Sequence, residues 1–272
     1  MITRLFTLME KKLIDFWSRY KPYKLHPDDQ AFLGDELKKY CLDLSYAEVQ
    51  EKYGPNLRTE EANKKFLANK NYTHKILTNM LVAPYLGDVI NSKIYFLMTN
   101  PGFHTSIYDD EHKDKEYVKI VLENLVLKLD KFLCLDNKAS KTLGYKYWSH
   151  RSRIPKISSL LAKLTNKNFK DTSQYLLKKF CLIESIAYHS IKKPSDLLLN
   201  MPSSQLTLEL VQKFILEKAM NDKAIVFIWR GKSFWQLPKH KNIIIRSTPI
   251  YPFITDDEAN QFAKFLAKSI NM

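Results

Sequence analysis

Four short apolar runs, each closed by a polar and aromatic segment, constrain the fold of this chain more than any other feature. They lie in residues 92–100, 178–188, 223–231 and 241–249. A short, continuous apolar run is typical of a strand covered on both faces, as in a parallel sheet. Stretches with helical periodicity separate the runs. The sequence therefore predicts an α/β fold, with a four-stranded parallel sheet flanked by helices.

The chain before these runs has a different pattern. Residues 1–80 favour helices, and the first of them places Leu5, Leu8, Leu13 and Phe16 near one face. A further helix is expected to begin after a Thr59 cap and to run towards Pro84. We therefore expect an N-terminal helical region, residues 1–83, packed on an α/β domain formed by residues 84–272.

The charge is positive and unevenly distributed. The net charge is +14, and residues 131–253 hold 22 Lys and Arg against 7 Asp and Glu, whereas residues 1–90 hold 14 against 12. A basic field over one part of a fold attracts polyanions, chiefly nucleic acid. General enrichment in lysine is the competing explanation, but it would not produce this asymmetry. The charge distribution favours DNA as the partner.

The cysteines and the absence of known motifs exclude several classes of protein. Cys41, Cys134 and Cys181 are scattered and form no metal-binding pair, so we expect a reducing, cytoplasmic setting without metal or cofactor. No run is long enough to span a membrane. Phosphate-binding loop, dinucleotide, serine-hydrolase and zinc-protease motifs are absent. The acidic stretch 109–116 is interpreted as a solvated helix start rather than a metal site.

The carboxyl ends of the four runs carry the candidate chemistry, because ligands of parallel sheets bind at that edge. Asn100 can position a water molecule, and Phe103 offers a ring for stacking. Glu184, in apolar company, is suited to proton transfer, and His189 can contact a phosphate or a base edge. The alternatives are an ordinary turn at residues 100–102, a satisfied core glutamate and a surface histidine.

Two further segments combine basic and aromatic residues, which suits a nucleic-acid backbone with an unstacked base. The first follows the third run, and the second lies in residues 144–156. The alternatives are a basic loop with Trp235 in the core and a solvated helix start. The expected DNA-binding residues are Lys146, Trp148, His150, Arg151, Arg153, Arg230, Lys232 and Ser233.

Residues 84–103, PYLGDVINSKIYFLMTNPGF, resemble the first motif of the uracil-DNA glycosylase superfamily, and are closest to the Asn-Pro-Gly form of its mismatch-specific branch. The resemblance covers roughly residues 84–272 and implies that family's four-stranded parallel sheet with helices on both sides. It implies that Asn100 positions the attacking water and that Phe103 stacks on the flipped base. Glu184 or Ser185 stands where the family presents an Asn to the base edge.

The resemblance also places residues 247–253 at the family's His-Pro-Ser-like loop. Tyr251 stands before Pro252 in place of the His, and Phe253 replaces the Ser. No catalytic Asp follows Asn100 at the position used by the most active branches. These departures point away from ordinary uracil specificity.

The expected function is that of a DNA glycosylase. It would cleave the N-glycosidic bond of a flipped, modified or non-canonical pyrimidine, in a duplex or a single strand, and leave an abasic site. Phage DNA is one source of such bases, which would make the protein a defence factor. Base-binding residues would be Phe103, Ser185, His189 and Tyr251, with Asn100 and Glu184 catalytic. The alternatives are a non-catalytic nucleic-acid-binding member of the fold and an unrelated α/β enzyme acting on nucleotides; no obligatory protein partner is evident.

Overall fold

The computed structural model describes residues 2–132, 135, 140, 142–246 and 254–270. Its main sheet has the strand order β3-β5-β4-β6-β7. The strands are β3 (Tyr85–Gly87), β4 (Ile94–Met98), β5 (Phe180–Glu184), β6 (Ile225–Ile228) and β7 (Ile243–Ile245). The last four are mutually parallel, as the apolar runs predicted, but β3 runs antiparallel to β5. The expected four-stranded parallel sheet is therefore corrected to a five-stranded mixed sheet.

The edge strand β3 depends on a glycine. Gly87 has φ +115°, and a Cβ built there would lie 2.6 Å from the carbonyl oxygen of Phe180 on the neighbouring strand. Only glycine adopts this backbone region readily and leaves room for such an approach. Asn124 completes the edge, since its side chain accepts from the Gly87 amide and donates to the Gly87 carbonyl.

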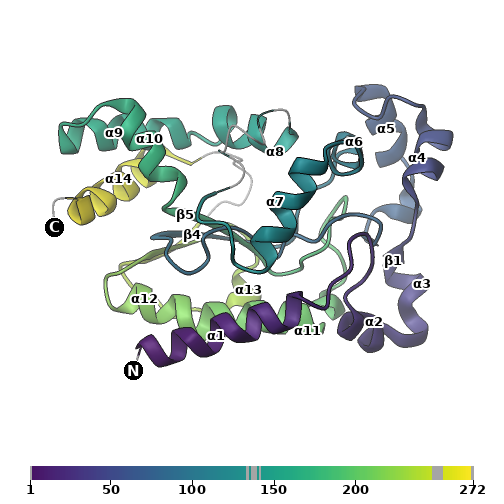
Figure 1. Cartoon of the computed structure of the whole chain (residues 1–272), viewed down its shortest axis with the longest axis horizontal. Helices are drawn as coiled ribbons and strands as arrows, with labels where there is room; N and C mark the ends of the chain where they lie inside the picture. Colours follow the sequence, from purple (N-terminus) through teal and green to yellow (C-terminus); the bar gives the residue numbers. More distant parts are fainter. Residues whose placement is uncertain (1, 133–134, 136–139, 141, 247–253, 271–272) are drawn as a thin grey trace.

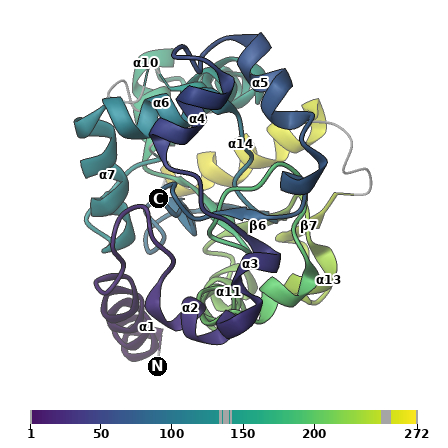
Figure 2. The ribbon, with the colours of Figure 1, turned by 90° about the vertical axis from the view of Figure 1, so that its right-hand side faces the viewer.

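Helices cover both faces of the sheet (Figures 1 and 2). One face is covered by α1 (Ile2–Trp17), α11 (Pro202–Glu209), the π-helical η7 (Leu210–Ile215) and α12 (Leu216–Met220); the other is covered by α9 (Ile154–Thr165), α10 (Phe169–Leu177) and α14 (Asp256–Ile270). Each face of the sheet has its own hydrophobic core: the first lies under α1, α11, η7 and α12, and the second under α9, α10 and α14. Side chains along a strand alternate between the two cores, as the strand pleat requires. In β4, Tyr95 and Leu97 pack into the first core, whereas Phe96 packs into the second.

The remaining helices near the strand ends are short. They are α6 (Thr105–Lys113), α7 (Lys115–Leu125), α8 (Leu143–Lys146), the π-helical η5 (Tyr147–Arg151), η6 (Asp196–Asn200) and α13 (Lys232–Trp235). No helix within the described residues is long and apolar enough to cross a bilayer. The free cysteines Cys41 and Cys181 are both buried, and Cys134 lies outside the described residues.

The N-terminal region is only partly as expected. Its elements are α2 (Pro27–Leu33), η1 (Gly34–Glu36), α3 (Leu37–Tyr40), β1 (Cys41–Leu42), α4 (Tyr46–Tyr53), α5 (Glu60–Leu67), η2 (Lys70–Tyr72) and β2 (Ile76–Leu77). Thr59 does cap α5, but that helix ends at Leu67 and does not reach Pro84. Its chain then enters β2, which pairs with β1. Leu8, expected on the buried face of α1, is 65% exposed, whereas Leu13 is buried.

A buried hydrogen-bond network joins the N-terminal region to the rest of the chain. The Tyr188 hydroxyl donates to Asp29 Oδ2 at 2.6 Å and accepts from the His26 amide at 3.0 Å. The other carboxylate oxygen of Asp29 accepts from the Ser203 amide at 2.9 Å. Because Asp29 is fully buried, these partners replace the water it loses on folding.

Candidate functional site at the carboxyl edge of the sheet

Strand register brings several predicted residues to the same edge. Met98 pairs with Glu184, and the ladder continues from the Ser185 amide to the Met98 carbonyl and from the Ile186 amide to the Thr99 carbonyl. On the other side of β4, the Arg230 amide donates to the Leu97 carbonyl. The backbones of residues 97–99, 184–186 and 230 therefore meet at the carboxyl end of the central strands.

Glu184 has the most unusual environment at this edge. It is 4% exposed, and its Oε2 has no hydrogen-bond partner among the described residues. Burial raises the pKa of its carboxyl to about 8, and the positive charge of Arg230 opposes the rise. The surroundings of Glu184 are apolar because Phe180 and Leu182 lie on the same side of β5 and belong to the second core. Glu184 therefore holds a proton at neutral pH, which makes it a donor rather than a base.

Asn100 is held in one orientation. Its Nδ2 donates to Ser190 Oγ at 2.8 Å and to the Pro101 carbonyl at 3.0 Å, and Ser190 Oγ donates in turn to the Lys192 carbonyl at 2.6 Å. The amide nitrogen thus faces protein, while the side chain as a whole is half-buried. This is a preorganised amide at the end of β4.

Two of the predicted base-binding residues have structural roles. Phe103 packs against Phe66 of α5 and Tyr108 of α6, with ring centroids 4.6 and 5.8 Å away. Ser185 is fully buried, and its hydroxyl donates to the Thr99 carbonyl at 2.6 Å. Ser185 is therefore closed to a ligand, whereas Phe103 is half-buried and holds its ring against α5 and α6. Tyr251 lies outside the described residues.

His189 is buried rather than on the surface, and it faces a residue that sequence reasoning missed. Its Nδ1 donates to the Gly102 carbonyl at 2.8 Å, and its Nε2 lies 3.7 Å from Oε1 of Glu111. Burial lowers the pKa of His189 to about 4 and raises the pKa of Glu111 well above its ordinary value. Each group therefore favours its neutral form. The other Glu111 oxygen accepts from the Leu81 amide at 2.8 Å.

The acidic stretch 109–116 is only in part the solvated helix start that the sequence suggested: Asp114 caps α7 and Glu116 is exposed, but residues 109–111 are buried. Asp109 and Asp110 are 1% and 3% exposed, and Arg58 forms ion pairs with both at 3.4 and 2.6 Å. Tyr46 also donates to Asp109, at 2.7 Å. These partners come from α4 and the segment after it, about 50 to 60 residues earlier in the chain. The local sequence around Asp109 and Asp110 therefore does not predict their burial. Within the described residues, no group of three His, Cys, Asp or Glu side chains is arranged to hold a metal ion.

The predicted DNA-binding residues divide into exposed and buried groups. Lys146, His150, Arg153, Arg230, Lys232 and Ser233 are exposed. Trp148 is 6% exposed and packs in the second core against Phe96 and Trp229, so its ring does not contact DNA from this position. Arg153 pairs with Asp256 at 3.1 Å. The side chain of Arg151 lies outside the described residues.

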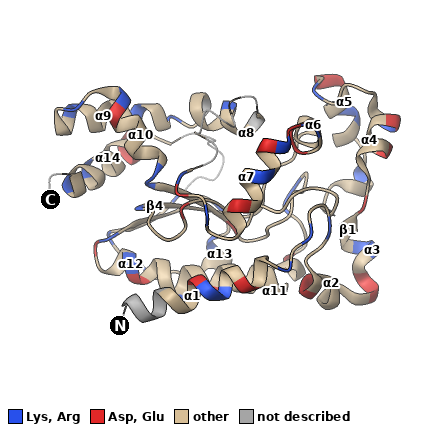
Figure 3. Cartoon of the chain, viewed as in Figure 1, with Lys and Arg blue, Asp and Glu red and all other residues tan. Residues whose placement is uncertain are grey.

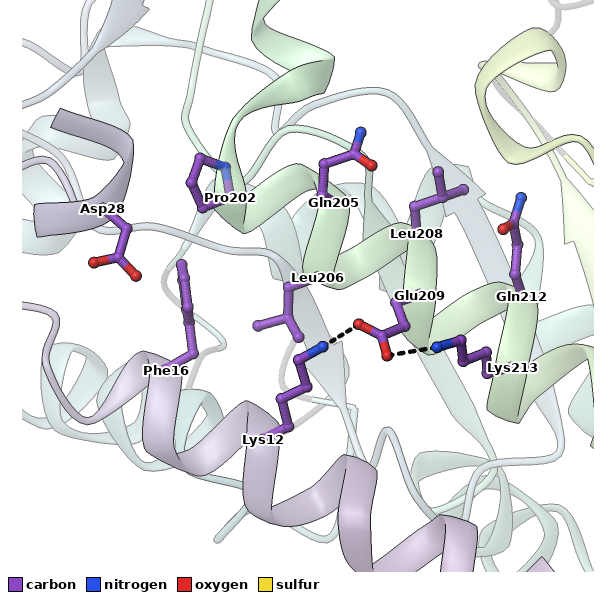
Figure 4. Close-up of a pocket in the computed structure, with 10 residues that line it drawn as sticks. All are labelled: Lys12, Phe16, Asp28, Pro202, Gln205, Leu206, Leu208, Glu209, Gln212 and Lys213. Atoms are coloured by element: carbon purple, nitrogen blue, oxygen red, sulfur yellow. Dashed lines mark hydrogen bonds and ion pairs between the residues drawn. The ribbon is translucent and has the colours of Figure 1, made fainter. Parts of the chain in front are cut away.

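A separate hollow of about 450 Å³ lies along the seam between α1 and the α11–η7 helix, away from the strand ends (Figure 4). Its central carboxylate, Glu209, bonds both Lys12 and Lys213, the latter at 3.0 Å. The Lys12 pair joins α1 to α11, whereas the Lys213 pair lies within the α11–η7 helix. We therefore assign this hollow to helix packing.

The fold and the edge residues define a mixed α/β protein with a buried acid at the carboxyl edge of its sheet. Comparison with protein-family models, with curated proteins and with solved structures finds no match for this chain. Its function must therefore be argued from its own residues.

Proposed function

We propose that this protein is a monofunctional DNA glycosylase that hydrolyses the N-glycosidic bond of a flipped, modified pyrimidine. The observation that carries the proposal is the buried carboxyl of Glu184 at the sheet edge, in register with Met98, two residues before the fixed amide of Asn100. The sequence resemblance around Asn100 agrees with it. The extruded base leaves more easily when a proton donor protonates it. An acid with a pKa near the working pH is suited to that task.

The proposed reaction uses both residues. The bond between C1′ and the base nitrogen breaks with its electron pair moving to the base, and the Glu184 proton passes to the base. Water held by the Asn100 side-chain oxygen bonds to C1′, and its proton returns to the Glu184 carboxylate. The products are a free base and an abasic sugar, and the enzyme regains its starting state without a cofactor.

Exposed cations supply the DNA contact in this proposal. Arg230 and Lys232 lie on the segment that follows β6, and Lys146 lies just before η5; Figure 3 shows where Lys and Arg residues fall along the described chain. Neutralising phosphates releases counterions, so binding should weaken steeply as salt rises. A defence role against phage DNA would follow if the preferred base is one that the host lacks.

The test is an excision assay followed by alkali, which cuts at abasic sites. The substrates are DNAs carrying uracil, a mismatch, hydroxymethylcytosine or glucosylated cytosine, with unmodified DNA beside them. We expect strand breaks on one modified DNA, about 100-fold slower with Asn100→Ala or Glu184→Gln. Activity should also fall as the pH rises through about 8, because Glu184 loses its proton there. The exposed glutamate Glu51 provides a matched control, Glu51→Gln, which should retain full activity.

A second candidate, a non-catalytic DNA-binding protein, is favoured by one specific observation. Phe103, the ring expected to stack on the base, is instead packed against Phe66 and Tyr108. Salt-sensitive DNA binding without breaks on any substrate would support this candidate and overturn the glycosylase proposal.

A further inference from the structure

The opposite, amino-terminal edge of the sheet carries a pocket of its own. The pocket has a volume of about 690 Å³ and is lined by the segments that enter β4, β6 and β7, together with α12 and α14. This size falls within the range of small-ligand sites, roughly 300 to 1,000 Å³. It lies at the other end of the strands from Glu184, so it is independent of the proposed catalytic edge.

The pocket is strongly basic. Five lysines line it, Lys93, Lys218, Lys223, Lys241 and Lys268, and a single carboxylate, that of Asp222. That carboxylate is already engaged by Lys241 at 2.9 Å and by the Asn242 amide at 2.7 Å. Within the described part of the chain, Lys93, Lys223 and Lys268 form no ion pair. Their charges are therefore left without a protein counter-ion.

Lys218 fixes one wall of this pocket. Its ammonium donates to the Ile90 carbonyl at 2.7 Å, the Ser92 carbonyl at 2.8 Å and the Tyr95 hydroxyl at 2.6 Å. The three bonds hold residues 90–92 in place and bring a largely buried positive charge to the pocket. Burial lowers the pKa of Lys218 to about 8. The Asp88 carboxylate opposes this change, and repulsion from Lys93 and Lys179 adds a smaller lowering. An anion in the pocket would relieve this repulsion.

Polar and apolar groups complete the lining. Ser92 is fully buried, and its hydroxyl has no hydrogen-bond partner within the described residues, which is unusual for a native protein. Phe265 is half-buried and provides an aromatic wall, whereas Phe214 belongs to the core beneath the pocket and has the Lys218 ammonium 5.5 Å from the centre of its ring. Lysines beside the Phe265 ring suit a molecule with anionic and planar apolar parts. A bare inorganic anion would leave this ring unused, and a duplex backbone contacts extended surfaces rather than a hollow of this size.

We propose that this amino-edge pocket binds a small phosphorylated ligand of the nucleotide class, with its phosphates beside Lys93, Lys223 and Lys268 and its planar part against Phe265. The site would give the protein a second ligand, remote from the DNA edge. Lysine contacts to phosphate are charge-assisted hydrogen bonds, so each should contribute measurably to affinity.

The test is calorimetric titration of the full chain with ADP, pyrophosphate and inorganic phosphate at low ionic strength. We expect ADP to bind most tightly and phosphate most weakly. Lys268→Gln and Lys93→Gln should each weaken ADP binding about tenfold. Lys264→Gln is the matched control, since Lys264 is also exposed and lies one turn earlier on α14 but does not line the pocket; it should change the affinity less than about twofold.

Three results would overturn the proposal: no ADP binding at millimolar concentration, equal losses for Lys264→Gln and Lys268→Gln, or duplex DNA binding through Lys93 and Lys268 that ADP does not compete with. Both pocket lysines are partly or fully exposed, so their substitution should leave folding intact, and circular dichroism checks this. Asn100→Ala should leave ADP binding unchanged, which separates this proposal from the glycosylase proposal.

Discussion

At the scale of single residues, the protein keeps three ionisable groups buried in or near the carboxyl edge of the sheet. Within the described part of the chain, one oxygen of Glu184 lacks a hydrogen-bond partner. Glu111 and His189 face each other, and each side chain has one hydrogen bond to the backbone. Burying a carboxyl costs stability whenever the pH would ionise it. These buried ionisable groups destabilise the fold, yet they lie at the sheet edge where parallel α/β proteins bind ligands. Their position is therefore consistent with a chemical role.

Glu184→Gln should stabilise the protein in a pH-dependent way. The ordinary pKa of 4.5 applies to the unfolded chain, and the folded value is about 8. Between these values the unfolded state is ionised while the folded state holds the proton, so the wild type loses stability as pH rises through that window. Each unit of pKa shift corresponds to about 1.4 kcal/mol. Glutamine cannot ionise, so the variant avoids this loss.

Thermal melts of both proteins across this pH window provide the measurement. The two melting temperatures should be close at about pH 4.5 and should diverge up to about pH 8, by roughly 4 °C or more. Glu51→Gln, at an exposed position, is the control. A constant difference at every pH would contradict the assignment of a protonated Glu184.

At the scale of elements, the start of α14 is tied to the sheet by one carboxylate. Glu258 accepts from the Thr255 amide at 2.7 Å, and Thr255 Oγ1 accepts from the Glu258 amide at 3.3 Å, which is a capping box. Glu258 also pairs with Arg246 at 3.0 Å, and the Arg246 side chain is only 3% exposed. The guanidinium in turn lies 4.4 Å from the centre of the Trp229 ring.

Glu258→Ala should therefore cost more than Thr255→Ala. Loss of the Thr255 cap removes about 1 kcal/mol from the free energy of unfolding. Loss of Glu258 removes the cap and also an ion-pair partner of a buried Arg246, so we expect about 3 kcal/mol. Urea titration of both variants and of the double variant measures this. Equal costs would show that the Arg246 pair contributes nothing.

Helices and strands could be predicted where the local sequence pattern determines them. They were missed where contacts from distant parts of the chain determine them. The continuous apolar runs predicted β4 to β7, because both faces of these strands are buried. Tyr85–Gly87 is too short to form such a run, and its pairing with β5 is non-local. Asp109 and Asp110 carry a surface pattern, and only contacts from Arg58 and Tyr46 bury them. At the candidate site, Asn100 and Glu184 could be selected from their place after apolar runs, whereas Glu111 could not.

At the scale of the whole molecule, the N-terminal region shares its core with the α/β part. Met9, Leu13, Phe16 and Trp17 of α1 belong to the same buried cluster as Tyr95 and the other residues on that face of the sheet. The Tyr188–Asp29 bond adds a polar connection between the two parts. A contiguous core across the sequence boundary near residue 83 implies cooperative unfolding of both parts.

Leu13→Ala tests this cooperativity. Leu13 is 1% exposed, so truncation leaves a cavity and should cost about 2 to 5 kcal/mol. Leu8 on the same helix is 65% exposed, and Leu8→Ala should cost less than about 0.5 kcal/mol.

Circular dichroism and tryptophan fluorescence together measure whether the chain unfolds as one unit. Three of the four tryptophans, Trp148, Trp229 and Trp235, lie outside the N-terminal region. If the chain unfolds as one unit, Leu13→Ala shifts a single transition equally by both methods. If residues 1–83 unfold separately, the helical signal will shift while the fluorescence transition stays near its wild-type midpoint. That result would mean that the cluster around α1 does not stabilise the sheet.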